Sequence, residues 1–556
     1  MPATVDGRQE ALSLLPLRSI QPRNSDDEDS DLDLFVDEDY AHEFDAINHS
    51  KSSRRAGPWT RLFSRLPIPR LPFPGFLGYQ KPQGSPPVDY GHRWIHKRRL
   101  LVWISLLLGF CFVFLGAFFP SYTRPPHHYL DLRRRASASS EPGRANPNKE
   151  QIFIAASVYD KDGSLISGAW GRNIVDLVDL LGPDNVFVSI YENDASQEAS
   201  KALYAFRKQL KCENIVVNEH LNTTGLQHVI MPDGRRLLKR IAFLAEVRNR
   251  ALAPLDDTNS PVHNTKFDKL LYVNDVVFDP IDAANLLLST NADENGRSNF
   301  RAACATDFIN PFKFYDTFAT RDLEGYDMGV PFYPWFAHAG DAASRKDVLS
   351  QKDAVRVRSC WGGMVAFKAS YFLNAPSGPP PVAPPRQSLS LRRDERNPGT
   401  TQNDMFLPAR FRAEEDPFWD ASECCLIHAD IQQADAEDLK EDTGIYMNPF
   451  IRVAYDTRTL SWLSFTRRFE RMSAPAQHVM NWIGKRPSDN PRRLEEPGQK
   501  VLDRVWVSDE KAGSGAYQDV ERIAKPGGFC GGRKLLALPE DGHGGHWWNQ
   551  APPPDG

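Results

Sequence analysis

The feature that most restricts how this chain can fold is an uninterrupted apolar stretch at residues 100–119, LLVWISLLLGFCFVFLGAFF. Its twenty residues carry no charge, and a helix of this length crosses the roughly 30 Å hydrocarbon core of a bilayer. The basic segment HRWIHKRR precedes it, so the positive-inside rule places the N-terminus in the cytosol. The length and the basic flank disfavour the alternative of a buried core helix. We therefore expect one transmembrane helix in a single-pass type II membrane protein, with its bulk luminal or extracellular.

The remaining composition divides the chain into regions. The net charge of −5 is small for 556 residues, so nucleic acid is not expected as the main partner. Residues 1–99 predict a disordered cytosolic tail, whose acidic run at 26–40 is either a solvated segment or a sorting or phosphorylation segment. Residues 120–150 suit a luminal stem, and the Pro-rich residues 376–401 a disordered insertion. Residues 457–556 form a partly irregular C-terminal extension.

Most of the cysteines follow the apolar stretch, on the side of the membrane where disulfides form. An even number allows full pairing in fifteen ways, and the sequence does not choose among them. Their spacing fits no zinc module. The residues concerned are Cys212, Cys304, Cys360, Cys424, Cys425 and Cys530.

Residues 151–456 alternate between strand and helix patterns, which predicts βαβ units and a largely parallel sheet. Such sheets bind ligands beyond the carboxyl ends of their strands. Ser157 and Tyr159 end the first predicted strand, Glu192 ends the second, and Asn274 and Asp275 end the fourth. We therefore expect these side chains to line a common ligand site.

The fourth of these segments, KLLYVNDVVFD at residues 269–279, places a carboxylate within strand-like residues. A buried carboxylate without a partner costs several kcal/mol or more. A hard cation held by oxygen ligands is a common partner, so Asp275 is a candidate metal ligand. The alternative is that Asp275 caps a turn or forms a local salt bridge.

Three later segments carry further chemistry. SCWGGMVAF offers the stacking face of Trp361, and Gly362 and Gly363 permit close backbone approach to a ligand, although a tight turn anchored by a core tryptophan fits as well. FRAEED holds three consecutive acids, Glu414, Glu415 and Asp416. In CCLIHADI, His428 ends a predicted apolar strand, where a histidine is usually a core residue but becomes a metal-ligand candidate beside Asp275.

In this order, the segments resemble glycosyltransferases of the GT-A fold. The resemblance implies a Mn²⁺ or other divalent cation on Asp275 and His428, and a sugar bordered by Gly362 and Gly363. It also implies that Glu415 and Asp416 meet the acceptor. SIYEND resembles the element whose acid, here Glu192, contacts the nucleoside. AEVRNRAL resembles the helix whose Arg248 and Asn249 hold base or diphosphate.

Residues 152–455 resemble more closely the fungal capsule-associated mannosyltransferases, glycosyltransferase family 69. The phrases that carry this are SVYDKDG, LLYVNDVVF, ATDFINPFKFYDTFATRD, SCWGGMVAF, FRAEEDPFWDASECCLIHADI and GIYMNPFIRVAYD. Membership implies a Golgi enzyme of GT-A-like α/β fold that transfers mannose from GDP-mannose to a mannose-containing glycan through an α-1,3 link. Asn274-Asp275-Val276 departs from the D-x-D pattern, because it supplies one carboxylate where that motif supplies two.

Two other hypotheses remain open from the sequence. The first keeps the fold but changes the donor, for example to a UDP-sugar in place of GDP-mannose. A non-catalytic Golgi scaffold that binds partner glycosyltransferases would explain the single carboxylate at residues 274–276. The acids at 414–416 favour an enzyme, since they are suited to orient an acceptor hydroxyl or to accept its proton.

Overall fold

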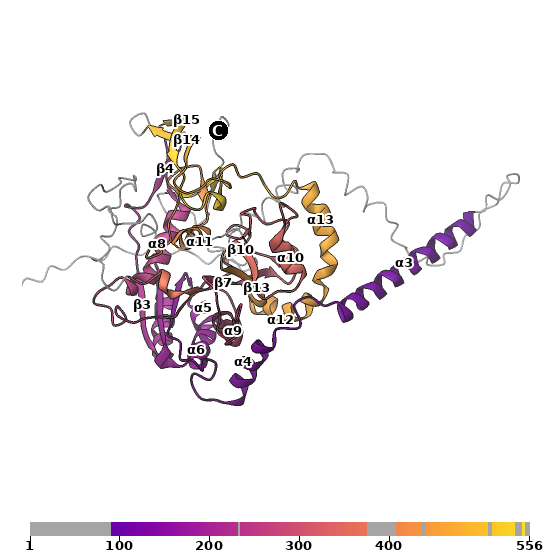
Figure 1. The fold of residues 1–556 in the computed structure, drawn as a ribbon, viewed down its shortest axis with the longest axis horizontal. Coiled ribbons are helices and arrows are strands. Elements are labelled where there is room, and N and C mark those ends of the chain that lie inside the picture. Colours follow the sequence, from indigo (N-terminus) through magenta and orange to yellow (C-terminus); the bar gives the residue numbers. More distant parts are fainter. Residues whose placement is uncertain are drawn as a thin grey trace, which may run out of the picture. The chain divides into compact units, whose positions relative to one another are not determined.

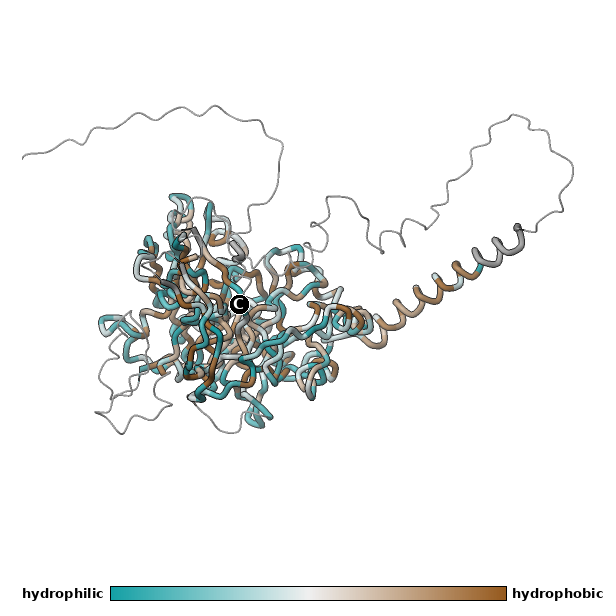
Figure 2. Tube along the Cα trace, turned by 90° about the horizontal axis from the view of Figure 1, so that it is seen from above, coloured by the Kyte–Doolittle hydropathy of each residue, from teal (hydrophilic) through white to brown (hydrophobic). Residues whose placement is uncertain are grey.

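The computed structural model describes residues 90–231, 234–374, 407–434, 441–509, 514–539 and 548–550. Residues 1–89 of the expected tail and the expected insertion at 376–401 lie outside the described residues. Helix α3 (Tyr90–Phe118) takes up the end of the expected tail as well as the apolar stretch. It contains one segment long and apolar enough to cross a membrane, Arg99–Phe118, of which only 6 % is buried. Figure 2 shows this hydrophobic helix projecting from the remainder of the chain.

A large sheet organises the domain, with the strand order β3-β2-β1-β6-β11-β7-β13-β10-β9 and β8 paired to β7. Pairing is parallel between β3, β2, β1 and β6 and again between β7 and β13. Only β11 is inserted antiparallel between β6 and β7, so these six strands run in one direction. This confirms the expected α/β class with a mostly parallel central sheet. The strands of this sheet are β1 (Ile152–Val158), β2 (Val186–Asn193), β3 (Glu213–Glu219), β6 (Lys269–Val273), β7 (Ala302–Asn310), β8 (Lys313–Phe314), β9 (Arg321–Asp322), β10 (Val355–Ser359), β11 (Met364–Lys368) and β13 (Ile445–Ala454).

Helices cover the sheet on both sides (Figure 1). Helix α8 packs on β1 and β2 and contacts α11, whereas α6 packs against α9 on the other side. The strands between them are almost fully buried because both faces are covered. The helices of this part are α4 (His127–Ala138), α5 (Ser164–Ser167), α6 (Ala169–Leu181), η2 (Pro183–Asn185), α7 (Gln197–Gln209), α8 (Arg240–Leu252), η3 (Ala253–Leu255), α9 (Pro280–Ser289), α10 (Ala343–Leu349), η4 (Ala369–Tyr371) and α11 (Glu423–Ala434).

The C-terminal extension is joined to the sheet domain at several places. Strand β17 pairs with β5, β16 pairs with β12, and the described residues form one compact unit. The extension contains α12 (Thr457–Thr466), η6 (Arg467–Ser473), α13 (Ala474–Ile483), β14 (Lys500–Asp509), β15 (Ser514–Ile523), η7 (Gly528–Cys530), β16 (Gly531–Gly532), β17 (Leu535–Pro539) and β18 (Trp548–Gln550). Its partners in the domain are β4 (His228–Ile230), β5 (Arg236–Lys239) and β12 (Asp420–Ala421).

Two local predictions differ from the structure. The segment CCLIHADI lies in helix α11 and not in a strand, since all its residues are buried and tertiary packing outweighs the apolar run. The expected stem at 120–150 contains α4, whose Tyr129 and Leu132 are buried in the core. This segment is therefore packed against the domain and not a free spacer.

Candidate functional site

The carboxyl ends of β1, β2 and β6 bring together most of the residues that the sequence places in the site. Strand β1 pairs with β2 so that Val158 lies opposite Glu192, and the neighbouring Ser157 accepts a 2.9 Å hydrogen bond from the hydroxyl of Tyr272 on β6. Tyr159 follows directly, half-buried in the connection to α5. The parallel register places these residues at the edge of the sheet, which is the position that the sequence predicts.

The turn after β6 is fixed by its backbone. Trp170 donates its indole N–H to the carbonyl of Asn274 at 2.7 Å, and the amide of Asn274 donates to the carbonyl of Gly363 at 2.9 Å. The half-buried carboxylate of Asp275 accepts no hydrogen bond from another group in the described part of the chain. Burial raises the pKa of Asp275 to about 6, while its own backbone N–H and Arg248 act in the opposite direction. A carboxylate held in this state is suited to gain a cation.

Arg248 on α8 is the cationic group beside this turn. It donates to the side-chain oxygen of Asn274 at 2.9 Å and to a carboxylate oxygen of Glu423 on α11 at 2.9 Å. Its guanidinium carbon lies 4.6, 5.4 and 5.8 Å from the ring centres of Trp361, Tyr272 and Phe411. These contacts hold a planar, permanently charged donor at the strand ends, the type of group that binds phosphate oxygens.

Gly362 and Gly363 lie directly over the turn after β6, and both have positive φ values, 57° and 66°. A Cβ at Gly362 would meet the carbonyl oxygen of Ala305 at 2.0 Å, and one at Gly363 would meet a methyl of Val276 at 2.6 Å. Both positions therefore require glycine, and the tight-turn interpretation is correct at the level of the backbone. The same turn places the pair beside Asp275, so the two interpretations are compatible.

Two buried acids that were not singled out from the sequence support this loop. Asp316 accepts from the amide of Gly362 at 3.1 Å, and Asp307 on β7 accepts from the amide of Asp316 at 3.1 Å and from the hydroxyl of Tyr455 at 2.9 Å. Burial, together with the charge of Asp316, raises the pKa of Asp307 to about 8. The pKa of Tyr455 is raised by burial and by the nearby Asp307 and Asp275. The sequence carried a signal for these two residues, because Asp307 in ATDF and Asp316 in FYD are acids within otherwise buried segments.

Glu192 is fully buried at the end of β2. One carboxylate oxygen accepts the amide of Asp160 at 2.7 Å, and the other has no hydrogen-bond partner among the described residues. Burial raises the pKa of Glu192 to about 8. Buried polar atoms are rarely left unpaired, so this oxygen is an available acceptor or donor for a ligand.

Asn249 is occupied by structural contacts. Its side chain donates to the carbonyl of Phe411 at 2.8 Å and accepts from the amide of Phe411 at 2.9 Å. Both bonds tie α8 to the segment that precedes the acidic triplet. Asn249 thus positions the loop that holds Phe411 against Arg248.

Each acid of the triplet at 414–416 is paired with a basic side chain. Glu414 lies 3.0 Å from Arg412, Glu415 lies 2.8 Å from Lys525, and Asp416 lies 2.6 Å from Arg492. Burial raises the pKa of Glu414, but the neighbouring Arg412 outweighs this effect and holds the pKa below its ordinary value. Lys239 donates to the backbone carbonyls of Glu414, Asp416 and Trp419, and its ammonium lies 3.4 Å from Asp420.

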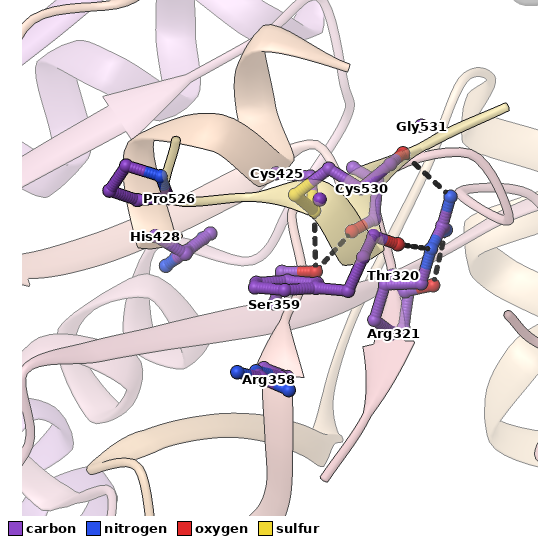
Figure 3. Close-up of a disulfide and its surroundings, with 12 residues drawn as sticks. Thr320, Arg321, Arg358, Ser359, Cys425, His428, Pro526, Cys530 and Gly531 are labelled. Atoms are coloured by element: carbon purple, nitrogen blue, oxygen red, sulfur yellow. Dashed lines mark hydrogen bonds between the residues drawn. A yellow bond between two sulfur atoms is a disulfide. The ribbon is translucent and has the colours of Figure 1, made fainter. Parts of the chain in front are cut away.

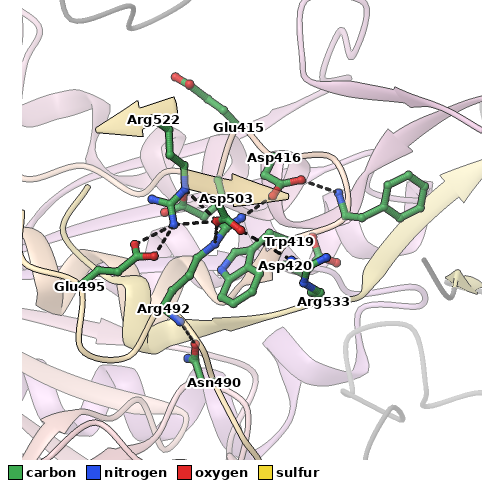
Figure 4. Close-up of polar contacts among 12 residues, drawn as sticks. Glu415, Asp416, Trp419, Asp420, Asn490, Arg492, Glu495, Asp503, Arg522 and Arg533 are labelled. Atoms are coloured by element: carbon green, nitrogen blue, oxygen red, sulfur yellow. Dashed lines mark hydrogen bonds and ion pairs between the residues drawn. The ribbon is translucent and has the colours of Figure 1, made fainter. Parts of the chain in front are cut away.

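Figure 4 shows that Asp416 belongs to a larger charge network. Arg492 bridges Asp416 and Asp503, and its guanidinium carbon lies 3.8 Å from the ring centre of Trp419. Arg522 then joins Asp503 to Glu495. Glu415 is the only member of the triplet with a largely exposed side chain, at 59 %. The C-terminal extension therefore fixes the conformation of the triplet.

His428 lies in the core on α11 (Figure 3). Its Nε2 is 2.6 Å from the carbonyl oxygen of Cys360, and its ring stacks on Phe367. Its Nδ1 is buried and has no hydrogen-bond partner in the described part of the chain. Burial lowers its pKa to about 4. A ring nitrogen also lies within 4.8 Å of the sulfurs of Cys304 and Cys360, but these two form a disulfide and offer no thiolate. These contacts favour the core-histidine interpretation.

Two disulfides pair four of the six cysteines that follow the apolar stretch. Cys304 pairs with Cys360 and Cys425 pairs with Cys530, whereas Cys212 and Cys424 are buried thiols. Beside the second disulfide, Arg321 donates hydrogen bonds to the carbonyls of Phe529 and Cys530 at 2.9 and 2.8 Å (Figure 3).

The donor set at the turn after β6 fits a divalent cation through Asp275 alone. Hard cations take oxygen ligands, and Mg²⁺-type sites combine one or two carboxylates with substrate phosphates and water. The carboxylate of Asp275 accepts no hydrogen bond from another described residue and lies near the charge of Arg248, whereas the nitrogens of His428 lie in the core. The site therefore fits a cation that completes its shell with a bound diphosphate.

Comparison with known proteins assigns the chain to a family. Residues 151–430, half of the chain, match the family described as Cryptococcal mannosyltransferase 1. A search of curated protein sequences gave no significant match. Among solved structures, the mannosyltransferase PcManGT from Pyrobaculum calidifontis in complex with GDP-Man and Mn²⁺ aligns at 10 % identity and a TM-score of 0.29, over 70 % of this chain and 77 % of its own. Mannosyl-3-phosphoglycerate synthase from Rubrobacter xylanophilus aligns at 13 % identity and a TM-score of 0.25, over 74 % and 95 %.

The TM-scores of both structures are too low to carry an argument about function. The family match covers the sheet from β1 through α11, and with it the turn after β6, the glycine pair and the acidic triplet. The chain therefore belongs to the cryptococcal mannosyltransferase 1 family of glycosyltransferases.

Proposed function

We propose that this protein transfers mannose from GDP-mannose to a mannose-containing glycan, forming an α-1,3 link in capsule, cell-wall or glycan synthesis. The observation that supports it best is the free carboxylate of Asp275 beside Arg248, at the carboxyl end of β6 and under the Gly362–Gly363 loop. The donor GDP-mannose is inferred from membership of this mannosyltransferase family.

Different residues bind different parts of the donor. Arg248, oriented by Asn274 and Glu423, binds the diphosphate and stabilises the charge that develops on the departing GDP. Glu192, with its unpaired carboxyl oxygen, contacts the nucleoside together with Ser157 and Tyr159. Trp361 is buried beside Arg248, and the backbone of the Gly362–Gly363 turn borders the sugar. A divalent cation, Mn²⁺ in our proposal, would be held by Asp275 and would supply positive charge beside the phosphates.

On the acceptor side we assign the orienting role to Glu415. Its side chain is largely exposed, whereas Glu414 and Asp416 are held in more buried ion pairs that shape the loop. A carboxylate in this position orients the acceptor hydroxyl or accepts its proton. Because the donor mannose is α-linked to GDP and the product is α-linked, the reaction retains configuration at the anomeric carbon.

We also propose a membrane location. Helix α3 spans a bilayer once, and the basic segment before it orients the N-terminus to the cytosol. The catalytic domain is then luminal, in the Golgi, where the two disulfides are stable.

GDP release tests the proposed activity directly. Purified full-length protein in detergent is incubated with GDP-mannose and either Mn²⁺ or EDTA, with and without α-mannobiose, and GDP is quantified. We expect release that requires the cation and increases with the acceptor, and loss of release in Asp275→Asn. Asp184→Asn, an exposed aspartate on η2, is the matched control and should behave as wild type.

Two outcomes would contradict the proposal. Release from another nucleotide sugar, but not from GDP-mannose, would change the donor. Absence of release from every donor, together with no thermal stabilisation by nucleotides, would support a scaffold that binds partner glycosyltransferases. A ligand at 100 times its Kd stabilises a fold by about 2.7 kcal/mol, so binding without turnover is measurable.

A further inference from the structure

The helices that follow the last sheet strand expose an unusual set of apolar side chains. Residues 457–483 run as α12, η6 and α13. Five large apolar side chains on the two α-helices are between 51 % and 79 % exposed: Trp462, Phe465, Val479, Trp482 and Ile483. On α12 the two side chains are three residues apart, and on α13 Trp482 and Ile483 follow Val479 by three and four residues, so each set lies on one face. We refer to this surface as the α12–α13 face.

The α12 part of this face is joined to the apolar span of α3 through η6. Phe469 of η6 stacks on Phe112 of α3, with ring centres 4.3 Å apart and planes within 7°. A Cβ at Gly116 would meet the Phe469 ring at 2.2 Å, so the absence of a side chain there creates the space that the ring fills. On the other side of this ring, Phe469 contacts Phe465, whose centre is 5.2 Å away. An unbroken row of aromatic contacts thus joins the span to α12.

The position of Phe112 along α3 gives the depth of this contact. Phe112 lies six residues before Phe118, the last residue of the helix. With a rise of about 1.5 Å per residue, it lies about 9 Å from the helix end. A helix lying in a bilayer surface buries its apolar face by about 5–10 Å. If α3 spans the bilayer, Phe469 and the side chains next to it on α12 reach lipid at the depth typical of such helices.

The charge of this segment matches a lipid surface. Residues 457–486 contain six basic side chains and one acidic side chain, Glu470, which is paired with Arg452. Arg467 donates only to the carbonyls of Tyr122 and Leu463, and no carboxylate lies within ion-pair distance of it in the described residues. It lines a cavity of about 460 Å³ between α4, α9, β13 and α12. The basic side chains are Arg458, Arg467, Arg468, Arg471, Lys485 and Arg486.

We propose that the α12–α13 face lies in the surface of the same bilayer that α3 spans, where its basic side chains bind lipid phosphates. Tryptophan prefers the boundary between headgroups and acyl chains, and long basic side chains extend from that depth to the phosphates. The domain is then held to the membrane by two attachments, and its orientation to the bilayer is set. The proposal rests on the membrane span proposed above, and the experiment below separates the two.

Spin-label depth measurement tests it on the full-length chain in lipid nanodiscs. In a Cys111→Ser background, single cysteines are introduced by Trp482→Cys and Trp462→Cys, labelled, and their accessibility to oxygen and to a water-soluble nickel complex is compared. Trp103→Cys, in the apolar span, is the lipid control, and Tyr204→Cys, exposed on α7, is the aqueous control. The background without an added cysteine corrects for labelling of buried thiols.

We expect labels at 482 and 462 to favour oxygen over nickel, at a depth between those of labels at 103 and 204. Aqueous accessibility at 482 and 462, with lipid accessibility at 103, overturns the proposal and leaves the span intact. Aqueous accessibility at 103 overturns the span itself. Spin–spin broadening at 482 that disappears on dilution with unlabelled protein would instead assign the face to contact between two copies.

A second experiment tests the role of the basic side chains. In nanodiscs that contain about 30 % phosphatidylserine, the label at 482 should lie deeper than in phosphatidylcholine alone. Arg458→Glu together with Lys485→Glu, both at exposed positions, should abolish this difference without unfolding the domain. An unchanged lipid dependence in this variant would contradict the assigned role of the basic side chains.

Discussion

At the scale of single residues, the site depends on how Arg248 is held. Its guanidinium is fixed by Asn274 and Glu423 through hydrogen bonds and by Trp361 through its ring face. Planarity is required for all three contacts at once, and a lysine ammonium offers only a point charge. The side chain therefore contributes geometry as well as charge to the proposed donor site.

Arg248→Lys should weaken GDP binding by about tenfold or more while the protein stays folded, because the ion pair with Glu423 can be kept but the stacked, forked geometry cannot. Isothermal titration calorimetry with GDP and thermal unfolding measure the two effects. Arg250→Lys on the same helix, where the arginine is more exposed and pairs with Glu246, is the control and should bind normally. Equal GDP affinity in both variants would remove Arg248 from the donor site.

Glu192 predicts a pH dependence of stability. Its pKa is raised from 4.5 to about 8 by burial, so the folded chain keeps this proton over a range in which the unfolded chain has lost it. The free energy of unfolding should therefore fall as the pH rises from about 4.5 to 8, by up to roughly 1 kcal/mol per pH unit. Glu192→Gln keeps an acceptor for the amide of Asp160 and has no proton to lose.

Thermal unfolding between pH 5 and pH 8 checks this prediction. The stability of Glu192→Gln relative to wild type should increase steadily with pH. Glu198→Gln, an exposed residue at the start of α7, should keep the wild-type profile. Parallel profiles for wild type and Glu192→Gln would show that Glu192 is ionised in the folded chain.

At the scale of elements, the connection between β10 and β11 determines the shape of the proposed donor site. Gly362→Ala places a Cβ 2.0 Å from a backbone oxygen of β7, and the residue also has a positive φ. Gly296→Ala has a positive φ of 73° but open space around the Cβ. Both changes cost about 1–2 kcal/mol of left-handed strain, and only the first forces the backbone to move.

We therefore expect Gly296→Ala to lower stability modestly and keep full activity. Gly362→Ala should lower stability further and abolish GDP release, because the displaced loop lies over Asn274 and Asp275. Denaturant unfolding and the GDP-release assay measure both. Full activity in a folded Gly362→Ala protein would show that the loop does not shape the site.

The elements show which features the sequence could predict. The sequence pattern, in which apolar runs alternate with helical segments, predicted β1, β2, β3, β6 and β7, because these runs are bounded by polar turns. The same reasoning was wrong for CCLIHADI, because a helix buried on all sides is as uniformly apolar as a central strand. The roles of Asp307 and Asp316 required the tertiary structure, since only the fold brings FYD to the amide of Gly362.

At the scale of the whole molecule, the C-terminal extension was the part that the sequence described least. It has few long periodic segments, and its contacts join residues far apart in the chain. Arg492 and Lys525 pair with the acidic triplet, and β17 extends the sheet that contains β5. These contacts make the extension part of the structure that holds the acidic triplet, to which we assign the acceptor side.

The Cys425–Cys530 disulfide is the covalent link between the extension and the domain, and it closes a loop of 105 residues. Chain-entropy estimates assign about 4.7 kcal/mol to a loop of about this length, and strain lowers the value. Cys425→Ser together with Cys530→Ser should therefore lower Tm markedly. Once the link is broken, Lys525 is no longer held beside Glu415, so activity should fall by more than donor binding does.

Limited proteolysis, Tm and GDP release distinguish this effect from general unfolding. New cleavage should begin in the extension, after residue 484, while the family-matched region at 151–430 stays protected. Cys111→Ser, which removes an exposed thiol that forms no disulfide, is the control and should leave all three measurements unchanged. An unchanged Tm in the double variant would mean that the pairing of β17 with β5 and the ion pairs hold the extension without the disulfide.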